Sequence, residues 1–207
     1  MMKSKMINHR QKKQQETEES LALEAVRTLI RWGGDDPDRA GLQDTPARVL
    51  AFYKDFFSGR DIAPANYAGS LAPDVTYDDL ILIRDIRLVS FCEHHMLPAS
   101  GRAHIAYIPD QKIAGLGSFA KIAAVCSRRF TTQEAITNDI IEMIQTAFSP
   151  CGVAVMVSLS HGCMTLRDPM QSRSVTLTTK FSGIFQSEPS RQQQFLMLAE
   201  RPYDKKE

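Results

Sequence analysis

The sequence has no long hydrophobic run, few cysteines and almost no net charge. No apolar stretch approaches the roughly 18 to 20 residues of a membrane-spanning helix, and the basic first residues lack the apolar segment of a signal peptide. Four cysteines among 207 residues are too few for a disulfide framework, so each is expected to be a free thiol or a metal ligand. These absences predict a cytoplasmic protein with no membrane contact.

The charge balance excludes a further group of functions. Lys and Arg total 25 against 24 Asp and Glu, which gives a formal net charge of +1. Proteins that act mainly by binding nucleic acid need a clustered basic surplus, so no nucleic-acid partner is expected. Hydrophobic residues make up 43% of the chain and predict one substantial core.

Three regions differ in their residue patterns. Residues 1–18 are rich in Lys and Gln without apolar periodicity, which predicts a flexible tail. Residues 19–70 contain a predicted pair of helices and a linker: the first helix stops at Gly33-Gly34, and Thr45-Pro46 supplies the N-cap and first position of the second. Residues 71–207 are predicted to form the main domain.

Strand and helix patterns follow one another in the main domain in the order ββααββ. The expected strands are 80–91, 102–108, 152–160 and 174–181, and the expected helices are 118–129, 133–148 and 192–200. Together with the preceding helical pair, this order predicts an α+β fold.

Thiol and imidazole groups gather directly after two of the predicted strands. Cys92 and His95 lie three residues apart after one strand, and Cys163 follows another. Such soft donors are typical of zinc sites, and three protein ligands leave a fourth position open, as in catalytic zinc sites. A structural site would need a fourth ligand, for which Cys151 or His161 is a candidate. Buried thiols and surface histidines explain the same spacing without a metal.

Two histidines lie beside the candidate ligands. If Cys92 and His95 bind a metal, His94 points elsewhere and is free to act as a general acid or base near neutral pH. His161 has the corresponding position beside Cys163.

An amide and a carboxylate, Gln133 and Glu134, begin one predicted helix. An acid in the first turn ordinarily complements the helix dipole. The alternative is recognition of guanine, in which the carboxylate accepts hydrogen bonds from the ring N–H and the exocyclic amine while the amide reads the carbonyl. A candidate anion site, for which solvated surface charge is the ordinary interpretation, would draw on Arg48, Lys121, Arg128, Arg129 and Arg167.

Longer strings carry a family resemblance: SFCEHHMLPASGRAHIAYIP, then IAGLGSFAKIAAVCSRRFTTQEAIT, and then GVAVMVSLSHGCMTLR. From about residue 21 to residue 198, the chain resembles the GTP cyclohydrolase I family. The resemblance implies the tunnelling fold for residues 71–207, in which ββααββ subunits join edge to edge in a pentameric β-barrel ring. It also implies that two rings stack as a homodecamer, with active sites at subunit interfaces.

The same resemblance implies roles for particular residues. Cys92, His95 and Cys163 correspond to the family's Zn²⁺ ligands, and His94 and His161 to its catalytic histidines. In the family, zinc-activated water attacks C8 of GTP, formate leaves, and rearrangement of the ribose gives 7,8-dihydroneopterin triphosphate for pterin and tetrahydrofolate biosynthesis. The residues at substrate-binding positions are Gln133, Glu134, Ser118, Lys121, Arg167 and Arg48, the last lent by a neighbouring subunit.

Several positions around the triphosphate depart from the family pattern. Gly117-Ser118 stands where the family has Ser-Lys, Ala51 where another lysine is expected, and Asp168 where a glycine follows Arg167. Each charge-assisted phosphate contact contributes roughly 1.5 to 3 kcal/mol, so these departures predict weaker triphosphate binding. Two alternatives follow: a paralogue that acts on a less phosphorylated guanine nucleotide or stops at a ring-opened product, and a non-catalytic ring subunit that binds nucleotide or pterin.

Overall fold

The chain divides into two compact units between residues 57 and 58. The computed structural model describes residues 2–57, 66, 71–72, 77–110 and 113–200. Apart from Asn66, the predicted linker from residue 58 to residue 70 lies outside the described residues. No helix in the described part of the chain is long and apolar enough to cross a membrane.

The N-terminal unit consists of two helices, α1 (Met2–Trp32) and α2 (Thr45–Phe56). α1 includes residues 2–18, for which the sequence predicts a flexible tail. These residues form a helix because they lack Pro and Gly and are rich in the good helix formers Lys, Gln and Glu. It ends at the expected place, where Gly34 adopts a positive φ of 88°. The N-cap of α2 is Asp44, one residue before the predicted Thr45, and Pro46 lies in the first turn as expected.

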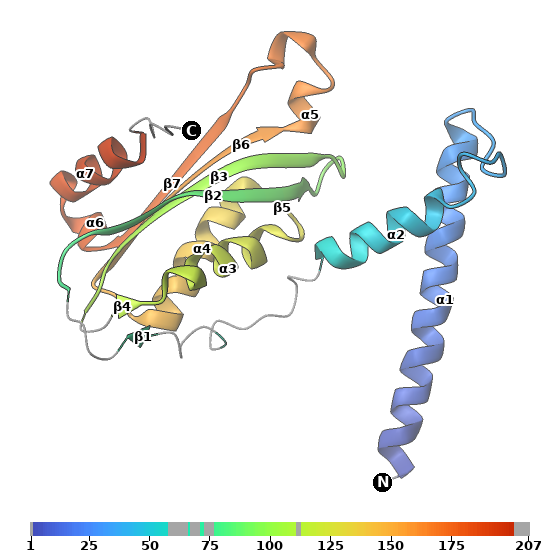
Figure 1. The fold of residues 1–207 in the computed structure, drawn as a ribbon, viewed down its shortest axis with the longest axis horizontal. Helices are drawn as coiled ribbons and strands as arrows, with labels where there is room; N and C mark the ends of the chain where they lie inside the picture. The colour runs from blue at the N-terminus through green and yellow to red at the C-terminus, as the bar shows by residue number, and fades with distance from the viewer. Residues whose placement is uncertain (1, 58–65, 67–70, 73–76, 111–112, 201–207) are drawn as a thin grey trace. The chain divides into compact units, whose positions relative to one another are not determined.

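A five-stranded sheet forms the centre of the second unit, in the order β5-β2-β3-β6-β7 (Figure 1). Neighbouring strands are antiparallel except for β2 and β5, which are parallel. A separate two-residue pairing joins β1 (Leu71–Ala72) to β4 (Ile113–Ala114). The strands of the main sheet are β2 (Ile81–Cys92), β3 (Pro98–Ile108), β5 (Phe130–Thr131), β6 (Gly152–His161) and β7 (Thr176–Gly183).

Helices cover both faces of this sheet (Figure 1). On one face, α3 (Leu116–Ser127) and α4 (Gln133–Phe148) build the larger apolar core against β2, β3 and β6. On the other face, α6 (Ile184–Ser187) and α7 (Pro189–Glu200) build a smaller core around Phe185. The short helix α5 (Gly162–Thr165) and the 3₁₀-helix η3 (Pro169–Gln171) lie between β6 and β7.

The order and types of these elements confirm the predicted α+β fold. Among the long strands, the predicted and observed bounds differ most for β3, which begins at Pro98 and not at the predicted Arg102. The prediction placed the start too late because Pro98 and Gly101 are residues typical of turns. Gly101 serves strand pairing: a Cβ there would lie 2.0 Å from the carbonyl oxygen of Ser158 in β6. The missing side chain therefore allows β3 and β6 to approach closely.

β2 contains an irregularity far from its Cys92 end. The pairing register with β3 shifts between Ile83 and Ile86, where Asp85 adopts a positive φ of 60°. The Asp85 carboxylate accepts a hydrogen bond from Arg102 at 2.5 Å, and its backbone N–H donates to Nδ1 of His104 at 3.4 Å. Burial lowers the pKa of His104, and the Asp85 charge opposes that shift.

Candidate active site

The three predicted metal ligands lie together at one edge of the main sheet. Cys92 is the last residue of β2, His95 lies in the turn to β3, and Cys163 lies in α5 directly after β6. Their ligand atoms are all within 4.8 Å of one another. Two thiols and an imidazole form a donor set that suits zinc.

Strand pairing explains why residues so distant in the sequence meet. Ala99 of β3 lies opposite Ser90 of β2 on one side and opposite His161 of β6 on the other. The loop after Cys92 and the helix α5 therefore leave the sheet at the same edge. The loop is tight, because the Cys92 carbonyl accepts a hydrogen bond from the backbone N–H of Met96 at 2.9 Å.

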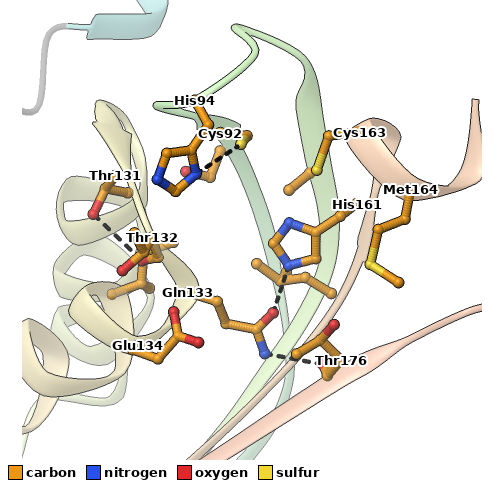
Figure 2. Close-up of a pocket in the computed structure, with 14 residues that line it drawn as sticks. Cys92, His94, Thr131, Thr132, Gln133, Glu134, His161, Cys163, Met164 and Thr176 are labelled. Atoms are coloured by element: carbon orange, nitrogen blue, oxygen red, sulfur yellow. Dashed lines mark hydrogen bonds between the residues drawn. The ribbon is translucent and has the colours of Figure 1, made fainter. Parts of the chain in front are cut away.

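A pocket of about 200 Å³ opens beside this ligand group (Figure 2). The ends of β2 and β6, the beginning of α4 and the helix α5 supply its walls. Six of the residues singled out in the sequence line it: Cys92, His94, Gln133, Glu134, His161 and Cys163.

The orientation of Gln133 follows from its hydrogen bonds. Its amide nitrogen donates to the carbonyl oxygens of Val157 at 3.0 Å and Thr176 at 2.9 Å and to the hydroxyl of Thr178 at 3.2 Å. Since the two carbonyls only accept, the Oε1 atom must face the other way, where it lies 2.7 Å from Nε2 of His161. Nε2 of His161 therefore carries a hydrogen.

The other ring nitrogen of His161 faces the cysteine sulfurs across the pocket (Figure 2). Burial lowers the pKa of His161, and the negative charge of Glu134 opposes that shift. His94 also lines the pocket, and its Nδ1 atom lies 3.7 Å from Sγ of Cys92. Both predicted catalytic histidines thus lie at the same pocket as the ligand group.

The electrostatic surroundings of Cys163 favour the protonated thiol in the free chain. Burial raises its pKa, and the hydrogen bond with Cys92 raises it further, while the charge of Arg167 has the opposite effect. A bound divalent cation would reverse this preference, because it stabilises the thiolate.

Glu134 lies in the first turn of α4, with its carboxylate directed toward the pocket (Figure 2). Thr132 is the N-cap of this helix, and its side chain accepts a hydrogen bond from the backbone N–H of Ala135 at 3.2 Å. This cap sets the position at which the helix starts and so places Gln133 and Glu134 on the pocket wall.

Arg167 follows α5 and lies beside the ligand group. Its Nη1 atom donates to Nε2 of His95 at 2.9 Å. The neighbouring Asp168 caps η3, and its carboxylate accepts from the backbone N–H of Met170 at 2.9 Å. The carboxylate that departs from the family pattern is therefore hydrogen-bonded within its own turn.

The predicted phosphate contacts of the second unit, Arg167, Ser118 and Lys121, do not line this pocket. Ser118 is 6% exposed in the first turn of α3, and Lys121 lies exposed farther along that helix. Arg48 belongs to the N-terminal unit, where it pairs with Asp44 at 3.0 Å. Within the second unit, the structure thus brings together the expected metal, catalytic and base-reading residues, while Ser118 and Lys121 lie outside the pocket.

Sequence reasoning missed some of the residues that line the pocket, Ser90 and Thr176 among them. A signal for Ser90 is present in the sequence, because residues two apart in a strand face the same side and Ser90 precedes Cys92 by two. Thr176 has no such signal, because its place depends on the pairing of β7 with β6.

A family model described as GTP cyclohydrolase I matches residues 22–200. The chain belongs to the GTP cyclohydrolase I family. The matched range agrees with the extent of the resemblance in the sequence, and the chain is an enzyme of this kind.

Curated relatives agree with the family model. GTP cyclohydrolase 1 of Sinorhizobium fredii is 44% identical over 178 residues, which cover 86% of this chain and 87% of that protein. GTP cyclohydrolase 1 of Brucella anthropi is 44% identical over 178 residues, which cover 86% and 84%. A solved structure, that of the archaeosine synthase QueF-Like in the apo form, aligns with a TM-score of 0.42 at 21% identity over 52% of this chain and 96% of that chain. That likeness is too weak to add to the assignment.

Proposed function

We propose that the chain hydrolyses GTP: water opens the guanine ring at C8, formate is released, and the product is 7,8-dihydroneopterin triphosphate. The observation that carries this proposal is the meeting of the Glu134 carboxylate and a group of candidate metal ligands at one pocket. The names of the relatives, GTP cyclohydrolase 1, support the same reaction.

Cys92, His95 and Cys163 would hold a zinc ion. Their donor atoms are of the kinds that zinc prefers and lie within 4.8 Å of one another, so the residues fit the ion. When bound, zinc supplies a Lewis acid that makes water nucleophilic near neutral pH.

His161 and His94 would transfer protons to and from the base. Because Gln133 holds the hydrogen on Nε2 of His161, the Nδ1 atom is the one left to exchange a proton with the substrate. The lowered pKa of His161 favours the neutral ring, which is the form that accepts a proton. His94 lines the same pocket and is the second candidate.

Glu134 would recognise guanine by accepting hydrogen bonds from the ring N–H and the exocyclic amine. The expected partner in this task, Gln133, has its amide nitrogen engaged by three acceptors within the sheet. We therefore propose that Gln133 orients His161 and does not read the guanine carbonyl.

The triphosphate would extend beyond the pocket. About 200 Å³ is less than the roughly 300 to 1,000 Å³ of typical small-molecule sites, so only the base fits inside. Because Ser118 and Lys121 do not line the pocket of their own chain, we propose that neighbouring copies supply them and Arg48. Such sharing requires a homo-oligomer, which we expect to be the tunnelling-fold ring in two stacked pentamers.

Formate release and pterin fluorescence, measured separately on zinc-loaded protein, test this function. We expect both signals with GTP and neither with the Cys163→Ser variant. Formate without fluorescence would mean that the reaction stops at a ring-opened product. Faster turnover of GMP than of GTP would favour a less phosphorylated substrate, the alternative suggested by the uncharged Ser118 and Ala51. Bound nucleotide without either signal would contradict the proposed reaction and favour a binding role.

A further inference from the structure

Ser90 carries a buried hydroxyl without a hydrogen-bond partner. It is 2% exposed, and its Oγ atom meets no donor or acceptor among the described residues. Proteins pair nearly all of their buried polar atoms, because an unpaired hydroxyl has lost its bonds to water without replacement. Where such a hydroxyl lines a pocket, its missing partner is expected to come from a ligand.

The strand register places Ser90 at the candidate active site. Ser90 lies opposite Ala99, which lies opposite His161, and all three residues line the pocket. Ser90 also shares one face of β2 with Cys92, two residues later. Ser90 therefore belongs to the wall that carries the metal-ligand group.

Apolar side chains line the same pocket as Ser90. Ala99, Ile136 and Leu159 line the same space, and each is at most 2% exposed. Apolar walls of this kind pack against the faces of a flat ring, whereas phosphate groups require positive charge. Arg167, the cation beside the ligand group, does not line the pocket.

We propose that Ser90 binds the base of the substrate, with its hydroxyl hydrogen-bonded to a ring nitrogen or carbonyl oxygen of the purine. This inference rests on the proposed function and adds a binding residue to it. A hydroxyl both donates and accepts, so Ser90 supplies affinity for the base while Glu134 supplies the selection of guanine.

The Ser90→Ala variant of the zinc-loaded full chain tests this role. We expect the KM for GTP and the inhibition constant of guanosine to rise by the same factor of about three to ten, the loss of one neutral hydrogen bond. The kcat should stay within about twofold of the wild-type value, because the hydrogen bond stabilises the bound substrate and the transition state equally. The thermal unfolding midpoint of the free protein should not fall, since no atom loses a partner.

Ser127→Ala is the matched control. Ser127 is 1% exposed in α3, and its hydroxyl donates to the carbonyl of Ala124 at 3.1 Å. This variant should lower the unfolding midpoint and leave both constants unchanged.

Unchanged constants in Ser90→Ala would overturn the proposal, as would an effect on GTP that is absent with guanosine. If the wild-type chain neither converts GTP nor is inhibited by guanosine, the proposed function and this inference fall together. If the wild-type chain is active and Ser90→Ala behaves like it, only the role of Ser90 is wrong.

Discussion

The Oε1 atom of Gln133 lies 2.7 Å from Nε2 of His161, while the amide nitrogen of the same side chain is held by β6 and β7. The side chain is 3% exposed, so it cannot turn toward a ligand without breaking these bonds. Gln133 therefore links the position of His161 to the pairing of two strands.

Gln133→Leu should lower kcat by about 10- to 100-fold, because a general acid or base that loses its orientation gives up much of its contribution. The KM for GTP should change by less than about threefold. Stability should fall by about 1 to 3 kcal/mol, because the carbonyl oxygens of Val157 and Thr176 lose a donor. Steady-state kinetics and urea unfolding measure these effects.

Thr178→Val is the control for Gln133. It removes one acceptor of the amide nitrogen and leaves the bond to His161 in place, so kcat should change little. A large rise in KM with an unchanged kcat in Gln133→Leu would assign Gln133 to base recognition after all.

Cys163→Ser should reduce bound zinc from about one ion per chain to almost none, because hydroxyl oxygen is a much poorer ligand for zinc than thiolate sulfur. Cys126→Ser should keep its zinc, since Cys126 is 1% exposed in α3 and burial raises its pKa to about 12. Metal analysis of the purified variants gives the result. Full zinc content in Cys163→Ser would mean that the ligand set is wrong.

Mixing two impaired variants tests whether active sites are shared between copies. Lys121→Ala should raise the KM for GTP by about 10- to 100-fold through the loss of a phosphate contact, and Cys163→Ser should abolish turnover. If Lys121 serves the site of another copy, co-assembled rings contain some sites with both residues intact. Activity at low GTP should then exceed that of either variant alone. Activity no higher than the two variants measured separately would place Lys121 in the site of its own chain.

Stability should decrease on mild acidification because of His104. Its pKa is lowered in the folded chain, so the unfolded chain binds the proton more tightly and the free energy of unfolding falls as pH drops below about 6.5. The pKa of Asp85 is lowered by the hydrogen bond from Arg102, so its stabilising effect is lost only at lower pH.

His104→Gln should flatten the pH dependence between about pH 7 and pH 5. Urea unfolding of zinc-loaded wild type and variant over this range gives the comparison, because any contribution from the metal site is common to both. Equal slopes would show that His104 is not the responsible group.

Local sequence patterns were enough to predict most of the main domain. The apolar period after Gln133 locates α4 correctly, and alternation in β2 leads directly to Cys92. The start of α1 was missed because its first half has helix-forming residues but no apolar face. β5, with only two residues, pairs too briefly to leave a pattern.

The gathering of the three candidate ligands was predictable, because their residue types alone indicate metal chemistry. Cys92, His95 and Cys163 are soft ligands after strand ends, and the structure brings them together. The hydrogen bonds of the Gln133 amide nitrogen could not be predicted, because their acceptors belong to strands that only the folded sheet brings near. The same holds for Ser90, whose lack of a partner is a property of its surroundings.

The central position of β3 in the sheet makes the candidate ligand group sensitive to errors in strand pairing. Through Ala99, this strand sets the alignment of both Ser90 and His161. A slip of one residue in either pairing would turn one of these side chains to the opposite face of the sheet and displace the adjoining cysteine. A chain with mispaired strands therefore could not gather the three candidate ligands at one edge of the sheet.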